Sequence, residues 1–469
     1  MTLASLSQRL QSGDCSAVEM LQDTLQRCRQ PAADHVFTLM TENVAMQQAE
    51  QADRLRQSGE AGPWAGIPIT IKDLFDLEGT VTMAGSKVLA NAKAEDATAS
   101  AIQRLIDAGF VIIGKANMTE FAYSGLGLNP HYGTPVNPWS GESELIPGGS
   151  SAGGAVSVAL DIVAATIGTD TGGSVRIPSS LCNLTGFKPA SMAVPADGVV
   201  PLAESLDSIG PLANSVACCS VLHNIMSGQG AEPVCAAQAN ASGTVSGLRM
   251  LIPEQSVLWL HTDIAIAERC EAALQRLEAA GAELVRSDTL FFDKVLESGV
   301  QSVLAGFESA RWHRALLEGS RNLYDPRVSS RIDNGAKIDE ALYHDALQIR
   351  AEFKRMYREL LTSFDAVVWP TTALYAPAFS ELESDEGYSR VNLDLLRNTS
   401  VGNTLDAAAI TLPLPCGWSP LLPQTAKPEG QQSNGLLPAG LMLHQCGDQD
   451  RELLQVAALI EGIVTGESA

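Results

Sequence analysis

Short runs of β-branched residues alternate with helical patterns from residue 66 onward, and this alternation limits the fold more than any other feature of the sequence. Strand-like runs cover residues 67–71, 111–113 and 162–167, with Gly and Pro residues between them. Residues 99–108 place apolar side chains at helical spacing. Because strands that alternate with helices pair mainly in parallel, the pattern predicts an α/β fold with a substantially parallel sheet.

The alternation resumes in the second half of the chain, after a Gly-, Ala- and Ser-rich stretch at 225–247 that reads as a linker or a long loop. The later predicted strands are 248–252, 283–285, 366–369 and 437–443, and the later predicted helices are 263–280, 337–361 and 448–464. Residues 1–60 are predicted to be helical. With no internal repeat or low-complexity tail, we predict a single domain over residues 1–469.

Charge excludes two classes of partner. The chain has 54 acidic and 31 basic residues, a net charge of −23, and no cluster of Lys or Arg. Nucleic acids and anionic membrane surfaces both require clustered positive charge, so neither is predicted as a partner. No apolar run reaches the ~20 residues of a membrane-spanning helix, and residues 1–30 lack the pattern of a secretory signal.

The cysteines and histidines predict a reduced compartment and no metal site. Nine cysteines, an odd number without a C-x-x-C pair, suit reduced thiols in a cytoplasm better than a disulfide framework. The seven histidines are scattered, and no His/Cys cluster has the spacing of metal ligands. We therefore expect a cytoplasmic protein without a metal.

Two short motifs suggest functions that their context disfavours. Residues 109–116 match a phosphate-binding loop except at Ala116, but the four residues between the glycines are bulky and read as a buried strand. Residues 149–153 match the G-x-S-x-G nucleophile elbow, with Ser151 as the nucleophile. The segment before them is short and ends in Pro-Gly, where an elbow needs a strand, and no histidine motif follows.

A third signal comes from three segments taken together, namely residues 67–73, 148–154 and 168–178. The glycine pair before Ser174 allows successive N–H groups to point into one cavity, as stabilisation of an oxyanion requires. A serine nucleophile needs a base, and Lys72 at the end of an apolar run is the candidate. Burial can lower a lysine pKa from ~10.4 towards ~7–8. Ser150 is a candidate to relay the proton between them.

These segments resemble the signature of the amidase signature family. The resemblance is strongest from about residue 66 to 189, fades to a weaker match at 438–441, and includes the 24 residues that separate Ser150 from Ser174. It implies a triad of Lys72, Ser150 and Ser174, with Ser174 the nucleophile and Ser150 a bridging serine after a cis peptide. The implied oxyanion hole is the backbone N–H groups of Thr171, Gly172, Gly173 and Ser174. The resemblance implies supporting roles for Ser151, Asp170 and Arg176. This chain has Ala152 at a position where many members of the family have glycine.

The resemblance also implies a fold and a reaction. The fold is a single α/β/α domain with a large mixed sheet: N-terminal helices in 1–60, the catalytic core in 66–189, and the rest of the sheet with a variable substrate pocket in 190–469. The reaction is hydrolysis of a small carboxamide to carboxylate and ammonia through a Ser174 acyl-enzyme, with no metal or organic cofactor. A small-molecule amide is the expected partner, and a homodimer is left open.

Two other functions compete with a free-standing amidase. One is the amidase subunit of a glutamyl-tRNA amidotransferase, which supplies ammonia to a partner; that subunit commonly has Gln after the signature arginine, whereas this chain has Ile177. The other is a catalytically silent binding protein on the same fold, which the intact triad disfavours.

Substrate-binding residues are predicted from two parts of the chain. The resemblance places the segment that begins with Tyr123, Ser124 and Gly125 at the border of the acyl pocket. From the variable half, the candidates for the pocket wall are Trp312, Tyr324, Tyr343 and Arg397. The acyl group and the leaving group are not predicted.

Overall fold

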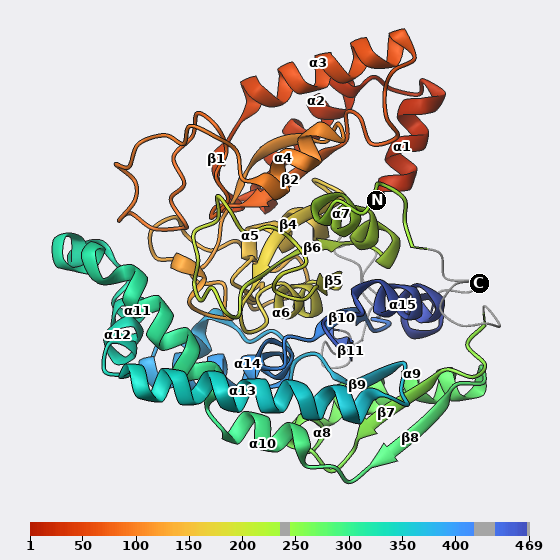
Figure 1. The fold of residues 1–469 in the computed structure, drawn as a ribbon. Helices are drawn as coiled ribbons and strands as arrows, with labels where there is room; N and C mark the ends of the chain where they lie inside the picture. Colours follow the sequence, from red (N-terminus) through yellow and green to blue (C-terminus); the bar gives the residue numbers. More distant parts are fainter. Residues whose placement is uncertain (235–243, 417–436, 467–469) are drawn as a thin grey trace.

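One mixed β-sheet of eleven strands, built from the described residues, runs through the molecule in the order β1-β3-β2-β4-β6-β5-β10-β11-β9-β7-β8 (Figure 1). The structure is a computed structural model that describes residues 1–234, 244–416 and 437–466. The strands are β1 Phe37–Met40, β2 Pro68–Lys72, β3 Val111–Ala116, β4 Ala165–Asp170, β5 Thr185–Lys188, β6 Ser208–Ala213, β7 Arg249–Pro253, β8 Glu283–Ser287, β9 Ala366–Pro370, β10 Ala408–Pro413 and β11 Gly440–Gln445.

The helices cover this sheet and enclose it. They are α1 Leu3–Ser12, α2 Ala17–Cys28, α3 Glu42–Ser58, α4 Ser100–Asp107, α5 Ala152–Ala159, α6 Arg176–Leu181, α7 Val216–Ser227, α8 Val257–Leu260, α9 Ile264–Ala279, α10 Phe291–Glu297, α11 Val300–Ser320, α12 Pro326–Gly335, α13 Glu340–Leu361, α14 Asp385–Thr404 and α15 Asp450–Thr465. Helices α1 to α3 lie at one end of the molecule, and α10 and α13 lie at the opposite end (Figure 1).

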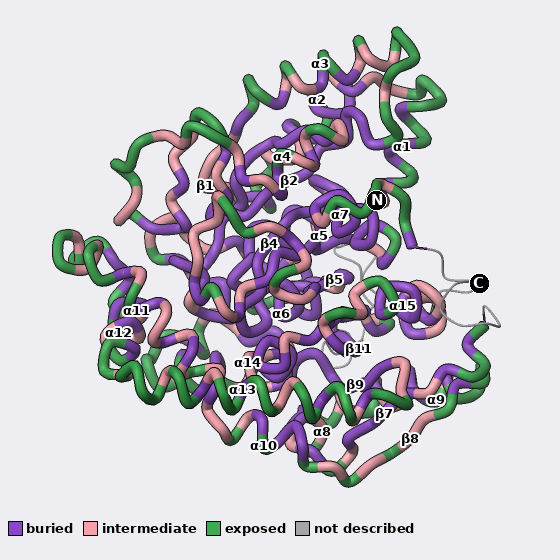
Figure 2. Tube along the Cα trace, in the orientation of Figure 1, coloured by how far each residue is buried: buried purple, intermediate pink, exposed green. Residues whose placement is uncertain are grey.

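Two helical layers pack on the sheet. Helix α7 contacts β5 and β6, α15 contacts β10 and β11, and α15 also contacts α7 and α9, so these three helices form one layer. Helix α5 contacts β2 and β4, α6 contacts β5, β10 and β11, and α14 packs on α6, forming the other. The strands between them are buried, while the outer sides of α3 and α13 are exposed (Figure 2).

Strand β2 shows why the sequence folds this way locally. All five of its residues are buried, and it lies between β3 and β4, parallel to both. A strand covered on both faces needs side chains that tolerate burial. Residues 67–71 supply three isoleucines, a proline and Thr70, whose hydroxyl donates to Thr166 Oγ1. Lys72, the last residue of β2, is therefore carried into the interior.

Two expectations from the sequence need correction. The sheet is mixed, because β6, β5, β10 and β11 in its middle pair antiparallel with their neighbours. The prediction of a substantially parallel sheet from the alternation is therefore wrong. The mixed sheet that the resemblance implied is confirmed. Residues 1–60 also contain β1, which pairs antiparallel with β3 at the sheet edge and carries no alternation of buried and exposed residues to mark it as a strand.

Residues 109–116, which match a phosphate-binding loop in sequence, do not form such a loop, because most of them belong to β3. Residues 111–116 form a buried strand whose backbone pairs with both β1 and β2, so the segment folds as the context predicted. Within the described residues, no helix is long and apolar enough to cross a membrane. Seven described cysteines are free thiols, namely Cys15, Cys28, Cys182, Cys218, Cys219, Cys270 and Cys446, and Cys235 lies outside the described residues.

Candidate active site

Lys72 is a buried lysine whose hydrogen-bond partners among the described residues are two hydroxyl groups and a carbonyl, with no carboxylate. Its Nζ lies 2.7 Å from Ser150 Oγ, 2.9 Å from Thr169 Oγ1 and 3.4 Å from the Thr169 carbonyl. Burial lowers the pKa of Lys72 to about 7, against the charges of Asp207 and Asp170, which raise it. Near neutral pH, a substantial fraction of this side chain is therefore an uncharged amine that can accept a proton.

Ser150 contacts the lysine through its hydroxyl, and its neighbour Ser151 contacts the loop that carries Ser174. The Gly149–Ser150 peptide is cis, and the Ser150 carbonyl accepts a hydrogen bond of 3.1 Å from Thr119 N–H. Ser174 is 3% exposed and lines a cavity, and its carbonyl accepts a bond of 3.3 Å from the Ser151 N–H. The Ser174 hydroxyl makes no hydrogen bond to another described residue, as is common for a nucleophile before substrate binds.

The loop from Thr171 to Ser174 carries four consecutive backbone N–H groups that donate to no acceptor among the described residues. The next two, of Val175 and Arg176, both donate to Asp170 Oδ2. Gly173 has a φ of +142°, and a Cβ at this position would lie 2.2 Å from Thr399 Oγ1, so only glycine fits. Unpaired N–H groups beside a serine hydroxyl are the donors that an oxyanion hole needs.

A buried ion pair closes this loop on itself. Arg176 donates from Nε to Asp170 Oδ2 at 3.0 Å and from Nη2 to Asp170 Oδ1 at 2.9 Å, and neither side chain is exposed. Asn403 of α14 bonds both residues. Burial alone would raise the pKa of Asp170, but the charge and hydrogen bonds of Arg176 hold that pKa well below its usual range. The pair holds the start and end of the loop together.

Ser174 opens into a cavity of about 710 Å³. Its wall includes Tyr123, Ser124, Thr171 and Gly172, and from the second half of the chain residues of α10, α11, α12 and α14. Asn392 of α14 accepts hydrogen bonds of 2.9 Å from Ser124 Oγ and from Gly125 N–H. Of the predicted substrate residues, Tyr123, Ser124 and Arg397 line this cavity.

Other predicted residues lie elsewhere. Tyr324 is buried against Phe121 and shares a hydrogen bond of 2.9 Å with His313 Nδ1, so it does not line the cavity. Trp312 and Tyr343 line a separate depression. Gly125 sits behind the wall, against Ile177 and Leu396.

Ser151, which is predicted to support the site, contributes only its backbone to the hydrogen bonds there. Its hydroxyl is buried and has no hydrogen-bond partner, and only its backbone N–H reaches Ser174. It lies at the N-terminus of α5 rather than after a strand, which also explains why the elbow motif does not form here.

Four residues around the site carried no signal in the sequence. Gln301 and Thr399 hydrogen-bond the carbonyls of the 171–174 loop, and Arg331 lines the cavity. Asp207 accepts a hydrogen bond from Thr171 Oγ1 and two from the Leu202 and Ala203 N–H groups, at 2.9 and 3.1 Å. Burial raises the pKa of Asp207 to about 6. All four come from segments that no motif connects to the loop.

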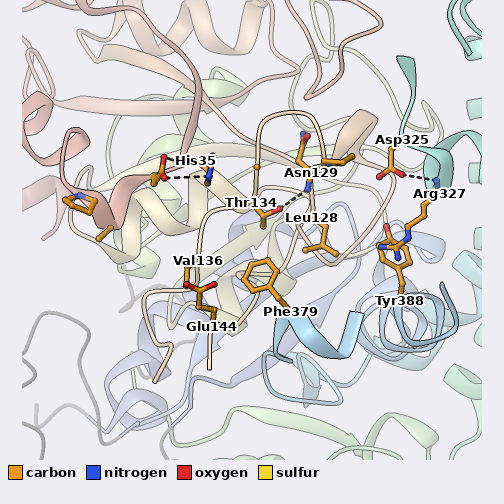
Figure 3. A pocket seen from close by; sticks show the side chains of 15 residues that line it. His35, Leu128, Asn129, Thr134, Val136, Glu144, Asp325, Arg327, Phe379 and Tyr388 are labelled. Atoms are coloured by element: carbon orange, nitrogen blue, oxygen red, sulfur yellow. Dashed lines mark hydrogen bonds and ion pairs between the residues drawn. The ribbon is translucent and has the colours of Figure 1, made fainter. Parts of the chain in front are cut away.

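A second pocket, of about 830 Å³, is lined in part by Tyr388 (Figure 3). Its wall includes His35, Glu144, Asp325 and Arg327, and none of Lys72, Ser150 or Ser174. Arg327 packs over the Tyr388 ring, with the guanidinium carbon 4.3 Å from the ring centre. The larger pocket is therefore not the one that holds the candidate chemistry. No group of three or more His, Cys, Asp or Glu side chains placed to hold a metal is found among the residues described.

Comparison with known proteins identifies the family to which this chain belongs. A family model for amidases matches residues 19–452. A solved amidase has the same fold, with a TM-score of 0.85 and 27% identity over 99% of this chain and 100% of that chain. The fold and the site thus define a hydrolase of C–N bonds. The chain belongs to the amidase signature family, as its motifs implied.

Two relatives indicate the range of functions nearby. The A subunit of the glutamyl-tRNA(Gln) amidotransferase from Pseudomonas entomophila (strain L48) is 35% identical over 404 residues, 79% of this chain and 82% of the relative. The 2-amino-5-chloromuconic acid deaminase of Comamonas testosteroni is 30% identical over 471 residues, 99% of this chain and 96% of the relative. The chain is therefore similar both to a deaminase and to one component of an amidotransferase.

Proposed function

We propose that this amidase hydrolyses a small carboxamide to a carboxylate and ammonia through an acyl-enzyme on Ser174. The observation that carries the proposal is the position of Lys72. Its buried Nζ lies 2.7 Å from Ser150 Oγ, its pKa is lowered to about 7 by burial, and Ser150 leads to the loop of unpaired N–H groups beside Ser174. A base in contact with a relay, and an oxyanion-stabilising loop at the cavity wall, are the parts that such a reaction needs.

Each residue has a distinct role in the proposed reaction. Ser174 Oγ attacks the amide carbonyl carbon, and its proton passes through the Ser150 hydroxyl to the Lys72 amine. The N–H groups of Thr171 to Ser174 stabilise the oxyanion that forms. Lys72 returns the proton through Ser150 to the departing ammonia. Water then attacks the acyl-enzyme by the same proton route in reverse, which releases the carboxylate and restores Ser174.

Ammonia release by the purified chain alone tests this proposal against its runner-up. The panel comprises short aliphatic, arylacetic and urea-derived amides and glutamine. Turnover of a panel amide without any partner would support the free-standing amidase. Glutaminase activity that appears only on addition of a tRNA-dependent partner would instead favour an ammonia-supplying subunit. That subunit is the second candidate because the chain is similar to the amidotransferase component.

A cytoplasmic location and a homodimer remain predictions. The free described thiols support the cytoplasmic location.

The cavity wall supports a finer proposal, that the substrate carries a carboxylate in addition to the amide. Arg331 of α12 lines the cavity, donates to the Tyr123 carbonyl, and lies over the rings of Tyr123 and Tyr388 at 6.0 and 5.4 Å. No ion pair between described residues includes it, whereas Arg397 pairs with Asp394 at 3.6 Å. Arg331 is thus the guanidinium of the wall whose charge no described carboxylate offsets.

Arg331→Leu should raise KM for a carboxylate-bearing amide by about 10- to 100-fold, because a charged hydrogen bond contributes about 1.5–3 kcal/mol. Neutral amides should change little. Arg327→Leu is the matched control, one helical turn earlier on α12 and packed on the same Tyr388 ring but lining the second pocket. An unchanged KM for the carboxylate-bearing amide in Arg331→Leu, or an equal rise in Arg327→Leu, would reject the carboxylate.

Activity should rise with pH through about 7, the pKa to which burial lowers Lys72. The lysine accepts a proton only when neutral, so it is inactive below its pKa. Asp207→Asn removes a negative charge that favours protonated Lys72. The pKa of Lys72 should then fall, and the ascending limb of kcat/KM should move to lower pH, as measured in pH–rate profiles.

Thr171→Val is a second test of this shift. It removes a hydrogen bond that lowers the pKa of Asp207, so the Asp207 carboxyl stays protonated to higher pH and its charge acts less on Lys72. Its ascending limb should therefore move in the same direction as that of Asp207→Asn, even if its rate falls. A limb that stays fixed in Asp207→Asn, or that moves to higher pH, would show that Lys72 does not set the profile.

A further inference from the structure

Three consecutive carbonyl groups of the loop beside Ser174 are each held by a side chain. The Asp170 carbonyl accepts bonds of 3.0 Å from Asn403 Nδ2 and 3.1 Å from Ser208 Oγ. The Thr171 carbonyl accepts a bond of 2.6 Å from Gln301 Nε2. The Gly172 carbonyl accepts a bond of 2.6 Å from Thr399 Oγ1. No carbonyl in this run is left to rotate freely.

The direction of a carbonyl fixes the direction of the next N–H. In a trans peptide the C=O and the following N–H lie in one plane and point in opposite directions, and the cis bond of the described chain is Gly149–Ser150, outside this loop. A side chain that holds the Thr171 carbonyl therefore aims the Gly172 N–H the other way. Likewise, the bond to the Gly172 carbonyl aims the Gly173 N–H.

The anchors differ in what else they do. Asn403 also bonds the Asp170 carboxylate and Arg176, so it belongs to the buried ion-pair network. The side chains of Gln301 and Thr399 each make one other hydrogen bond among the described residues. Besides the loop, Gln301 accepts one bond of 3.3 Å from Thr404, and Thr399 donates to the Leu396 carbonyl of its own helix at 3.2 Å. Gln301 in addition lines the cavity that Ser174 opens into.

We infer that Gln301 and Thr399 are positioning residues that aim the Gly172 and Gly173 N–H groups at the oxyanion. This inference rests on the proposed function, since it assigns the donors of that reaction their geometry. Neither side chain needs to touch the reacting atoms. Because Gln301 is also part of the cavity wall, it links the shape of the acyl site to the direction of the oxyanion donors.

The effect should fall on the transition state rather than on substrate binding. A misaimed N–H still allows the amide to bind but stabilises the developing negative charge less, which lowers kcat and leaves KM nearly unchanged. Removing an oxyanion donor outright costs about 10²–10³ in kcat. For a donor that is misaimed but present, we expect a loss of about 10- to 100-fold.

The variants are Gln301→Met and Thr399→Val, which keep the shape of the side chain and remove the donor. Thr399→Ser keeps the hydroxyl and should restore most of the lost rate. Thr362→Val is the matched control. The Thr362 hydroxyl also donates to carbonyls of the preceding helical turn, but Thr362 is the exposed C-cap residue that follows α13 and makes no hydrogen bond to the 171–174 loop. Its kcat and KM should match those of the wild type.

Two binding measurements separate positioning from general damage. An aldehyde analogue of the best panel amide adds to Ser174 and forms an oxyanion, whereas the carboxylate product binds without one. Aldehyde affinity should fall in parallel with kcat in Gln301→Met and Thr399→Val, and product affinity should stay unchanged. Parallel losses of aldehyde and product affinity, or an unchanged kcat in both variants, would overturn the inference.

Amide hydrogen exchange of peptides covering residues 168–176 tests the anchoring without any substrate. Exchange should speed up in Gln301→Met and Thr399→Val, and should be unchanged in Thr362→Val. Unchanged exchange in the first two would contradict the inference even in an inactive protein. Wild-type silence toward every panel amide would instead count against the proposed function, so the two failures can be told apart.

Discussion

Ser174→Ala should abolish amide hydrolysis, with kcat falling by at least about 10⁴-fold, because no acyl-enzyme can form without the attacking oxygen. The residual rate would reflect only the oxyanion loop and substrate binding. The variant should fold normally, since the Ser174 hydroxyl makes no hydrogen bond to another described residue and alanine fits the same space. Ammonia release at saturating substrate, with thermal unfolding measured alongside, gives the comparison.

Ser151→Ala is the control for this loss. The Ser151 hydroxyl is buried without a hydrogen-bond partner, so its removal breaks no bond and should leave kcat within about tenfold of the wild type. Mass spectrometry of a slowly deacylating ester would locate the acyl group on Ser174 in the wild type. Activity that survives Ser174→Ala and disappears in Ser151→Ala would assign the nucleophile to Ser151.

Lys72→Met should lower kcat by about 10³- to 10⁴-fold, the upper part of the range for loss of a general base. Methionine fills a similar volume but cannot accept a proton. Lys72→Arg should be equally inactive, because a guanidinium does not lose its proton near neutral pH. The pH–rate profile of the residual activity should also lose its ascending limb near 7.

Stability measurements distinguish this loss from misfolding. Lys72 is fully buried and has no carboxylate among its hydrogen-bond partners in the described part of the chain, so replacing it with an apolar side chain removes a desolvated amine from the interior. Lys72→Met should therefore unfold at a temperature close to that of the wild type. Activity in Lys72→Met within about tenfold of the wild type would show that another group accepts the proton.

The sequence was sufficient for the parts of the site that lie in continuous segments. Lys72 follows a largely apolar run, and Ser174 follows a glycine pair, so local patterns predict both a buried lysine and a loop with free N–H groups. The α/β class followed from alternating elements. The antiparallel middle of the sheet did not, because pairing direction depends on how distant strands such as β5 and β10 meet.

The cavity wall could be predicted only in part, for a related reason. Gln301 and Thr399 reach the loop across 130 and 227 residues of sequence, and no local motif records such a contact. Tyr324 is an aromatic residue of the variable region and therefore a candidate for the wall, but its ring packs against Phe121. Composition identifies which side chains could bind a substrate, whereas helix orientation decides which of them face the cavity.

The division of the cavity between two stretches of the chain has a consequence for how such enzymes diverge. The reacting groups are encoded between Lys72 and Ser174, while much of the wall comes from α10, α11, α12 and α14, which span residues 291–404. Mutations that retune substrate preference can therefore accumulate in one stretch while the other stays under purifying selection. Gln301 and Thr399 are exceptions, because drift at these two positions would alter the catalytic rate as well as the preference.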